Sequence, residues 1–178
     1  MFREDKTTQM AAAILKRSGG RIKYIHLMKM LYFADKQMLV ERGMPITYDA
    51  WVSMEHGPVL SSTLDLIRTK GKQPSYWSKH ITTEGNDVVL QADPGDDDLS
   101  LAEDAIIEKV FGEWGHVDRW EVVRASHNLP EWNDPGQSVS PISYEEVLKV
   151  SGFTMEDTKG VLENIEMQDD LRLLRKAA

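Results

Sequence analysis

Serine and histidine side chains are the groups in this sequence that could act as nucleophile and base, because the chain contains no cysteine. Ser126 and His127 are adjacent, which on a helix sets their side chains about 100° apart. A hydrogen bond that would activate the serine is therefore not expected between them. Catalysis would need groups that converge from distant segments, such as Asp49, Glu55, His56 and His127. We expect no enzymatic activity and no catalytic residue.

Metal and cofactor sites are not indicated by the residue spacing. The five histidines form no H-E-x-x-H or other close pairing that would bind zinc. The acidic stretch 92–98, ADPGDDD, lacks the carboxylate spacing of a calcium loop. We therefore expect no metal and no cofactor, and we interpret residues 92–98 as a solvated linker.

The tripeptide His56-Gly57-Pro58 has two interpretations. An imidazole at the N-terminus of a helix would lie among N–H groups that attract anions. A single histidine without partners does not make a site, however, so we favour a turn that starts a helix. That helix is predicted over Val59 to Lys70, with Pro58 near its first turn and Gly71 closing it.

The first of the elements that must position these residues is a helix at about 7–17. The "SGG" sequence at 18–20 ends this helix. From Lys23 to Arg42, apolar residues occupy nearly the whole circumference of a second helix, and Lys29 and 35–37 interrupt it. A helix that is apolar on all sides is typical of a buried central element. Gly43 and Pro45 end this helix.

Strands are predicted in two places. Residues 46–54 alternate between apolar and polar side chains, which indicates a short, half-buried strand at the edge of a sheet. Residues 77–91 favour two strands joined around the Gly85-Asn86 pair.

Helices dominate the chain after residue 98. They are predicted at about 100–114, 118–127, 143–150 and 155–175, and Ser-x-x-Glu capping boxes begin at Ser100 and Ser143. The expected fold class is mainly α (α+β): a compact helical domain, spanning 1–178, around a buried central helix with a small antiparallel sheet or hairpin.

The composition is typical of a folded globular protein. The chain has 178 residues, of which 41% are hydrophobic and 28% charged, so it is long enough to bury a core and too apolar to be disordered. Residues 1–9 resemble no secretory signal, and no stretch contains the roughly 18 apolar residues that a membrane span requires. We expect a cytoplasmic protein without membrane contact.

The net charge of −8 is divided unevenly along the chain. Residues 1–80 contain 13 Lys and Arg against 7 Asp and Glu, whereas residues 81–178 contain 8 against 22. In one interpretation the two halves face each other and the remaining acid keeps the protein soluble. In the other, an acidic surface binds a basic partner.

Nucleic-acid binding is the main rival to a protein partner, since two helices joined by "SGG" resemble a helix-turn-helix and this half is basic. A recognition helix must expose polar side chains to a groove, which the apolar helix 23–42 cannot do. Lys16, Arg17, Arg21 and Lys23 gather around the turn and could contact phosphates. We rank this regulator function below protein binding.

Four segments occur in an order that resembles the Panacea domain of SocA-like antitoxins. They are "LMKMLYFAD" at 27–35, "RGMPIT" at 42–47, "HGPV" at 56–59 and "ASHNLPEW" at 125–132. The resemblance covers about residues 7–133, and 134–178 would form a C-terminal helical extension.

The resemblance implies a bacterial or phage antitoxin of a toxin–antitoxin system, which binds a cognate protein toxin and neutralises it. In one branch of the family the antitoxin is a proteolytic adaptor that delivers the toxin to the ClpXP protease, so that ClpX is a further partner. We favour neutralisation by direct binding.

Aromatic residues in strand, turn and loop positions are the expected partner-binding residues, because large rigid rings contribute much of the binding energy at protein interfaces. The predicted surface consists of Tyr48, Trp51, His56, Tyr76, Trp77 and Trp132. In the alternative interpretation, Trp51, Tyr76, Trp77 and Trp132 pack in the core.

Overall fold

The computed structural model describes the backbone of residues 1–70 and 72–177, and the side chains of these residues up to 174. The described helices are α1 (Glu4–Arg17), α2 (Tyr24–Arg42), α3 (Ser61–Thr69), α4 (Tyr76–His80), α5 (Leu101–Trp114), α6 (Arg119–His127), α7 (Tyr144–Val150) and α8 (Met155–Ala177). The described strands are β1 (Arg21–Lys23), β2 (Trp51–Met54), β3 (Gly57–Leu60), β4 (Ile81–Glu84), β5 (Asp87–Leu90) and β6 (Ser140–Ile142). The predicted mainly helical fold class is confirmed.

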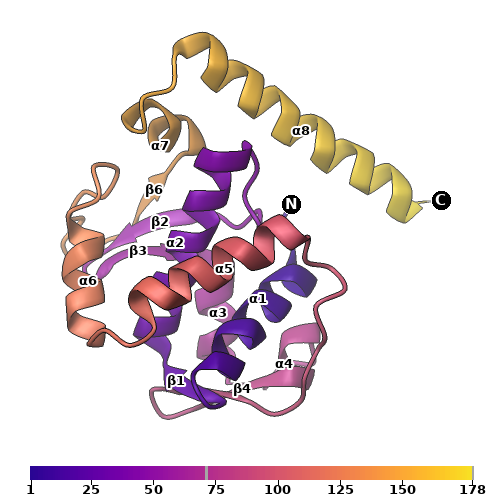
Figure 1. Cartoon of the computed structure of the whole chain (residues 1–178), viewed down its shortest axis with the longest axis vertical. Coiled ribbons are helices and arrows are strands. Elements are labelled where there is room, and N and C mark those ends of the chain that lie inside the picture. The colour runs from indigo at the N-terminus through magenta and orange to yellow at the C-terminus, as the bar shows by residue number, and fades with distance from the viewer. Residues whose placement is uncertain (71, 178) are drawn as a thin grey trace.

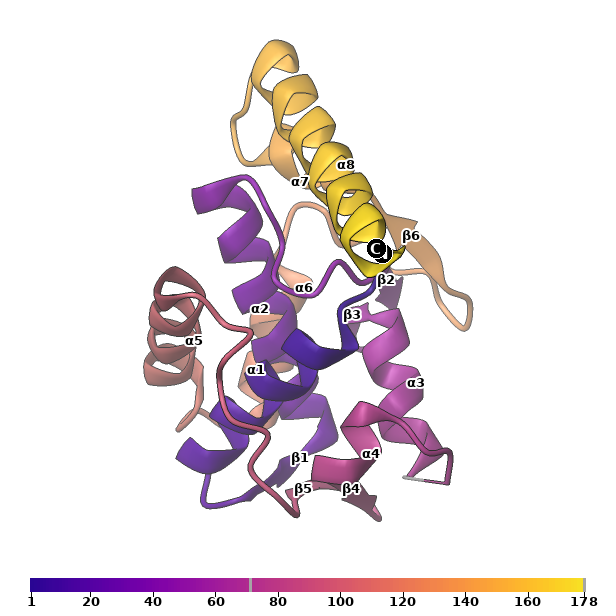
Figure 2. The same cartoon turned by 90° about the vertical axis from the view of Figure 1, so that its right-hand side faces the viewer.

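Helix α2 is the centre of the fold, as its apolar circumference predicts (Figure 1). It packs against α1, α5, α6 and α7, and also contacts both sheets. Figure 2 shows α5 on one side of α2, the β2–β3 hairpin with α3 on the other, and α1 in front of it. Two of the polar residues within its apolar run, Lys29 and Asp35, are completely buried. Each must therefore be satisfied by a specific internal partner.

Two small antiparallel sheets flank this helix, with strand orders β1-β5-β4 and β3-β2-β6. The predicted hairpin after residue 80 is confirmed, since Gly85 and Asn86 join β4 to β5. The segment 77–80, predicted as strand, instead belongs to α4, which starts at a Ser75–Ser78 capping box. A serine at the third helical position can close the capping box with its hydroxyl. The sequence prediction considered only Ser-x-x-Glu and therefore did not identify this box.

The strand predicted at 46–54 is shorter than expected and is not at an edge. Only Trp51 to Met54 pair, and β2 lies between β3 and β6. Residues 46 and 47 are held otherwise, because the Asp35 carboxylate accepts hydrogen bonds from both of their N–H groups, at 2.6 and 2.8 Å. A buried side chain of α2 thus takes the place of a neighbouring strand.

The helix predicted from Val59 begins later, at Ser61, because Gly57 to Leu60 form β3. Pro58 therefore lies in a strand and not in the first turn of a helix. Strand β3 is an edge strand, where the missing N–H of proline breaks no ladder. The Asp49 carboxylate caps α3 by accepting from the N–H groups of residues 62 and 63, at 2.8 and 2.9 Å. Gly71, expected to close this helix, lies outside the described residues.

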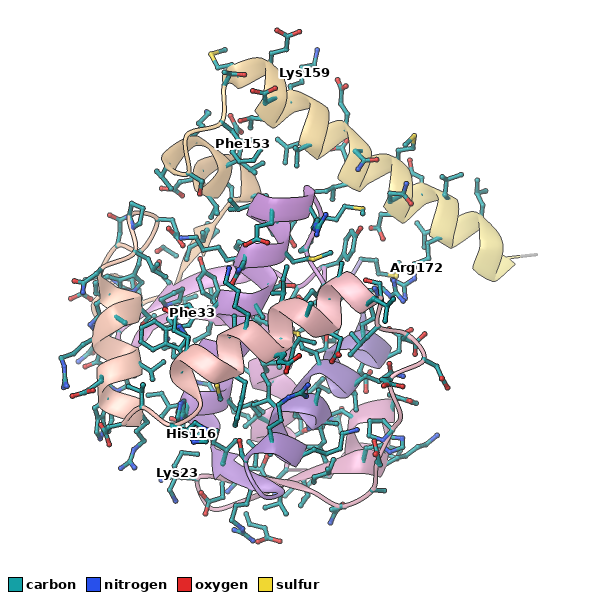
Figure 3. The ribbon with its side chains drawn as sticks, in the orientation of Figure 1. Lys23, Phe33, His116, Phe153, Lys159 and Arg172 are labelled. Carbon is teal, nitrogen blue, oxygen red and sulfur yellow. The ribbon has the colours of Figure 1, made fainter. Side chains whose placement is uncertain are left out.

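The predicted helices after the linker are confirmed within two residues. Ser100 and Glu103 form the expected reciprocal capping box, and Asp118 accepts from the N–H of Trp120. Helix α8 extends along the outside of the molecule, and Arg172 reaches from it toward the N-terminal segment, where its guanidinium lies 3.8 Å from Asp5 (Figure 3). In the described part of the chain, the helices lack the combination of length and apolar character that a bilayer crossing requires.

Ion pairs join the basic N-terminal half to the acidic second half. The pairs include Lys6–Glu103, Lys16–Asp93, Arg17–Asp104, Arg21–Glu84, Lys23–Asp87 and Lys36–Glu131. The four basic residues that could have contacted phosphates are all among them. This finding supports the interpretation that the two halves face each other, and it leaves the turn at 18–20 without a surplus of unpaired cations.

Candidate functional site

The turn between β2 and β3 is the place where three of the four segments of the sequence motif meet, those at 27–35, 56–59 and 125–132. Helix α2 contributes Lys29, the turn contributes residues 54–58, and α6 with the loop after it contributes Ser126, His127 and Trp132. We call this group of residues the turn site. Its parts lie up to about a hundred positions apart in the sequence, so that only the folded chain can assemble it.

Lys29 is the most unusual residue of the turn site. Its side chain has no exposed surface, and its Nζ donates one hydrogen bond, of 2.7 Å, to the Pro58 carbonyl. No carboxylate of the described residues lies within 4 Å of this nitrogen. Burial therefore lowers the pKa of Lys29 to about 7, because removal from water penalises the charged ammonium. Burial therefore favours the neutral amine over the ammonium.

Gly57 allows Lys29 and α6 to approach the turn closely. Its φ is +93°, in the region that favours glycine. A methyl group at this position would lie 2.3 Å from Ser126 Oγ and 2.8 Å from Lys29 Nζ, closer than atoms in contact can be. The absence of a side chain at residue 57 is thus a requirement of the site.

Ser126 and His127 act separately, as their adjacency predicts. The buried Ser126 hydroxyl donates to the Val123 carbonyl at 2.8 Å. The His127 ring stacks on Trp132, with centroids 4.2 Å apart and planes within 10°. Burial lowers the pKa of His127, and the charges of Lys29 and His56 lower it further.

The loop after α6 is tied to both α2 and the turn. Trp132 Nε1 donates to the Met54 carbonyl at 3.1 Å. The buried Glu131 carboxylate accepts from Tyr32 Oη and Lys36 Nζ of α2, each at 2.9 Å. Loop and hairpin are therefore fixed relative to the central helix.

The outer surface of the turn site carries an exposed aromatic residue. Trp120, at the start of α6, has 44% of its surface exposed and forms a T-shaped pair with the His56 ring, with centroids 6.1 Å apart. The Arg119 guanidinium lies 5.5 Å from the centre of the same indole. The periodicity of α6 could have predicted that Trp120 is exposed. Val122, Val123 and Ser126 form the buried face of this helix, and Trp120 lies outside that face.

The six predicted partner-binding residues do not form one surface. Trp51 and Trp77 are 2% and 1% exposed, so the expectation that they present their rings to a partner is wrong. Trp51 packs between Tyr32 and Tyr144, with ring centroids at 5.1 and 4.8 Å. Its indole nitrogen also donates to Asp35, at 2.9 Å.

The remaining four lie in three separate places. Tyr48 faces α8 and lines a hollow with Arg172. Tyr76 packs against His80 on α4, with the two rings inclined by 50°. Figure 1 shows α4 on the opposite side of the molecule from α6. Only His56 and Trp132 belong to the turn site. Asp49, considered above as a catalytic partner, caps α3 away from it.

Potential metal ligands are dispersed in the described residues, where no three His, Asp or Glu side chains converge. The turn site offers a different chemistry, namely a buried amine of low pKa, two imidazoles and a cavity of about 240 Å³ beside them. These features suit recognition of a complementary group.

The comparison with protein families identifies the class of protein. Residues 27–133 match the family described as "Antitoxin SocA-like, Panacea domain". The chain therefore belongs to this family, and the match contains the complete turn site. Family membership assigns an antitoxin role, with a toxin as partner in general terms. The searches of curated proteins and of solved structures gave no match.

The low pKa of Lys29 predicts how stability depends on pH. Between about pH 7 and about pH 10.5, the unfolded chain holds a proton on Lys29 that the folded protein lacks, so the free energy of unfolding rises with pH. From pH 7.5 to 9.0 the wild type should gain about 2 kcal/mol more than Lys29→Met. Urea unfolding of both proteins at the two pH values measures this gain. Parallel changes in the two proteins would contradict it.

Proposed function

We propose that the protein neutralises its toxin by direct binding, and that the toxin contacts the outer surface of the turn site. The exposed Trp120, braced by His56 and Arg119, carries this proposal. Tryptophan and arginine are enriched among the residues that dominate interface energies.

The fixed backbone of the turn site supports the same proposal. Trp132 and Glu131 hold the loop after α6, and Lys29 holds the hairpin, so that both sides of the Trp120 surface are preformed. A surface that is already ordered loses little conformational entropy when it binds. A toxin can therefore be sequestered without a large rearrangement of the antitoxin.

Removal of the Trp120 ring should weaken toxin binding with little effect on folding. We expect Trp120→Ala to lower the affinity at least tenfold, because a central aromatic anchor contributes about 2 kcal/mol or more. His56→Ala should have a smaller effect, since it only supports the indole. Calorimetric titration of the purified toxin encoded beside this protein measures both.

Leu101→Ala is a matched control, because Leu101 is 92% exposed and lies at the opposite end of α5 from α6 (Figure 1). It should leave the affinity unchanged. Full affinity in Trp120→Ala, or an equal loss in Leu101→Ala, would place the toxin elsewhere. Co-expression with the toxin in a growth assay gives the same test in cells.

A further inference from the structure

The cavity beside Lys29 has the composition of a ligand site. It encloses about 240 Å³ between α2, the β2–β3 turn and α3. Most of its wall is apolar, and Met28, Met54 and Leu64 contribute to it. A mostly apolar hollow with a few convergent polar groups is the usual form of a site for small molecules. This one is partly open to solvent and has a smaller volume than the roughly 300 Å³ of most such pockets. It therefore fits a group of about side-chain size.

Lys29 supplies the polar group in this wall. An ammonium has three N–H donors, and the one hydrogen bond described for Lys29 goes to the Pro58 carbonyl. A buried cation without a counter-ion is costly, and a negative group at hydrogen-bond distance would offset much of that cost. An anion beside Lys29 would therefore stabilise its charged form.

The charged residues at the rim of the cavity also favour a negatively charged ligand. Arg68 of α3 and His56 of the turn line it, against one carboxylate, that of Glu55. No carboxylate of the described residues lies within 4 Å of the Arg68 guanidinium. Because most of the wall is apolar, an anion that carries an apolar body fits the cavity better than a strongly hydrated ion such as phosphate. The ligand must combine a single anionic group with an apolar body.

We propose that this cavity binds a carboxylate with a short apolar body, whose oxygens pair with Lys29 and whose carbon chain packs against Met28 and Met54. A free carboxylic acid and a carboxylate carried by a bound protein present the same group. The first source needs no toxin, so the site can be tested on the purified antitoxin alone.

Hexanoate is a suitable probe, followed by NMR of the methionine methyl groups. In the full-length protein labelled with ¹³C-methyl methionine, Met28 and Met54 should shift saturably, whereas the exposed Met155 and Met167 report non-specific contact. Hexanamide has the same shape without the charge and should bind at least tenfold more weakly. Equal binding of acid and amide, or shifts confined to Met155 and Met167, would overturn the proposal.

Two variants test which residue supplies the positive charge that binds hexanoate. Lys29→Met should abolish the preference for hexanoate over hexanamide, and the methyl spectrum shows directly whether this variant is folded. Arg68→Met alters an exposed residue at the rim and should weaken hexanoate about threefold. An unchanged preference in folded Lys29→Met would assign the anion to another group and overturn the site.

The pH dependence gives a second readout. Hexanoate should bind at least fivefold more tightly at pH 6.0 than at pH 8.5, because burial lowers the pKa of Lys29 to about 7 and the carboxylate needs the ammonium. The other charged or titratable groups that face Lys29 are Tyr24 of α2, Glu55 and His56 of the turn, Arg68 of α3, and His127 of α6. Subtracting the pH dependence of hexanoate binding in Lys29→Met from that in the wild type removes the contribution of these other groups. No difference between the two proteins would overturn the assignment to Lys29.

Competition then identifies the source of the carboxylate. If the toxin inserts an acidic side chain, saturating hexanoate should lower its affinity for the wild type and not for Lys29→Met. If the natural ligand is a free acid, the toxin should bind equally with and without hexanoate. Loss of toxin binding in Trp120→Ala with intact hexanoate binding separates the two proposals, since Trp120 does not line the cavity.

Discussion

Asp35→Ala is expected to lower the free energy of unfolding by about 4 kcal/mol, enough to unfold much of the protein at 37 °C. The completely buried carboxylate accepts from the N–H groups of Ile46 and Thr47, from the Thr47 hydroxyl, and from Trp51 Nε1. Alanine would leave all four donors buried without an acceptor, and each one costs about 1–3 kcal/mol. Urea unfolding followed by tryptophan fluorescence measures the loss.

Asp35→Asn separates hydrogen bonding from volume. The amide keeps one acceptor oxygen but turns an NH₂ group toward existing donors, so it too should cost several kcal/mol. Asp65→Ala, at an exposed position of α3, is the matched control and should change stability by less than about 0.5 kcal/mol. A loss in Asp35→Ala no larger than in the control would show that water replaces the carboxylate.

The second large effect is expected for Gly57→Ala, which should lower the free energy of unfolding by about 3 kcal/mol and impair toxin binding. Part of the cost, about 1–2 kcal/mol, is the φ of +93°, which alanine adopts poorly. The rest is steric, because the new methyl group would overlap Ser126 Oγ and Lys29 Nζ. The hairpin must then move away from α2 and α6. Urea unfolding and calorimetric titration with the toxin measure the two effects.

Gly20→Ala is a close control, since Gly20 has φ +84° and a methyl group added there would meet no atom within 4 Å. It should show the backbone cost alone. Adding Ser126→Ala to Gly57→Ala removes the closest overlap and should restore part of the stability. If Gly20→Ala and Gly57→Ala lower the free energy of unfolding equally, the hairpin can accommodate a methyl group at residue 57 without a steric clash.

The helices can be predicted from local patterns because their signals lie within a few residues. The apolar circumference of α2 and the capping residues Ser100, Asp118 and Ser143 are visible in the sequence and end up where expected. The strands are predicted less accurately. Residues 46–50 alternate like a strand, yet Asp35, eleven positions before Ile46, supplies the hydrogen bonds that a neighbouring strand would give. Because this hydrogen-bond partner lies outside the segment, the pattern of residues 46–50 cannot indicate it.

The aromatic residues show the same limit. Trp51 and Trp77 lie in short elements where either face can be buried, and the structure buries both. Trp120 lies in a longer helix whose periodicity does identify its exposed side, so the prediction could have included it. Lys29 stands out as a lone charge in an apolar helix, but its burial depends on the hairpin 29 positions later.

The separation of the motif segments also affects when an antitoxin becomes active during synthesis. Trp132 closes the turn site on Met54, which lies 78 positions earlier in the chain. At about 5–20 residues per second, the ribosome needs roughly 4–16 s to make that intervening length. Until then the hairpin and Lys29 lack the α6 loop that completes their surroundings. If the toxin binds the turn site as proposed, a nascent chain that ends before this loop therefore lacks part of the binding surface.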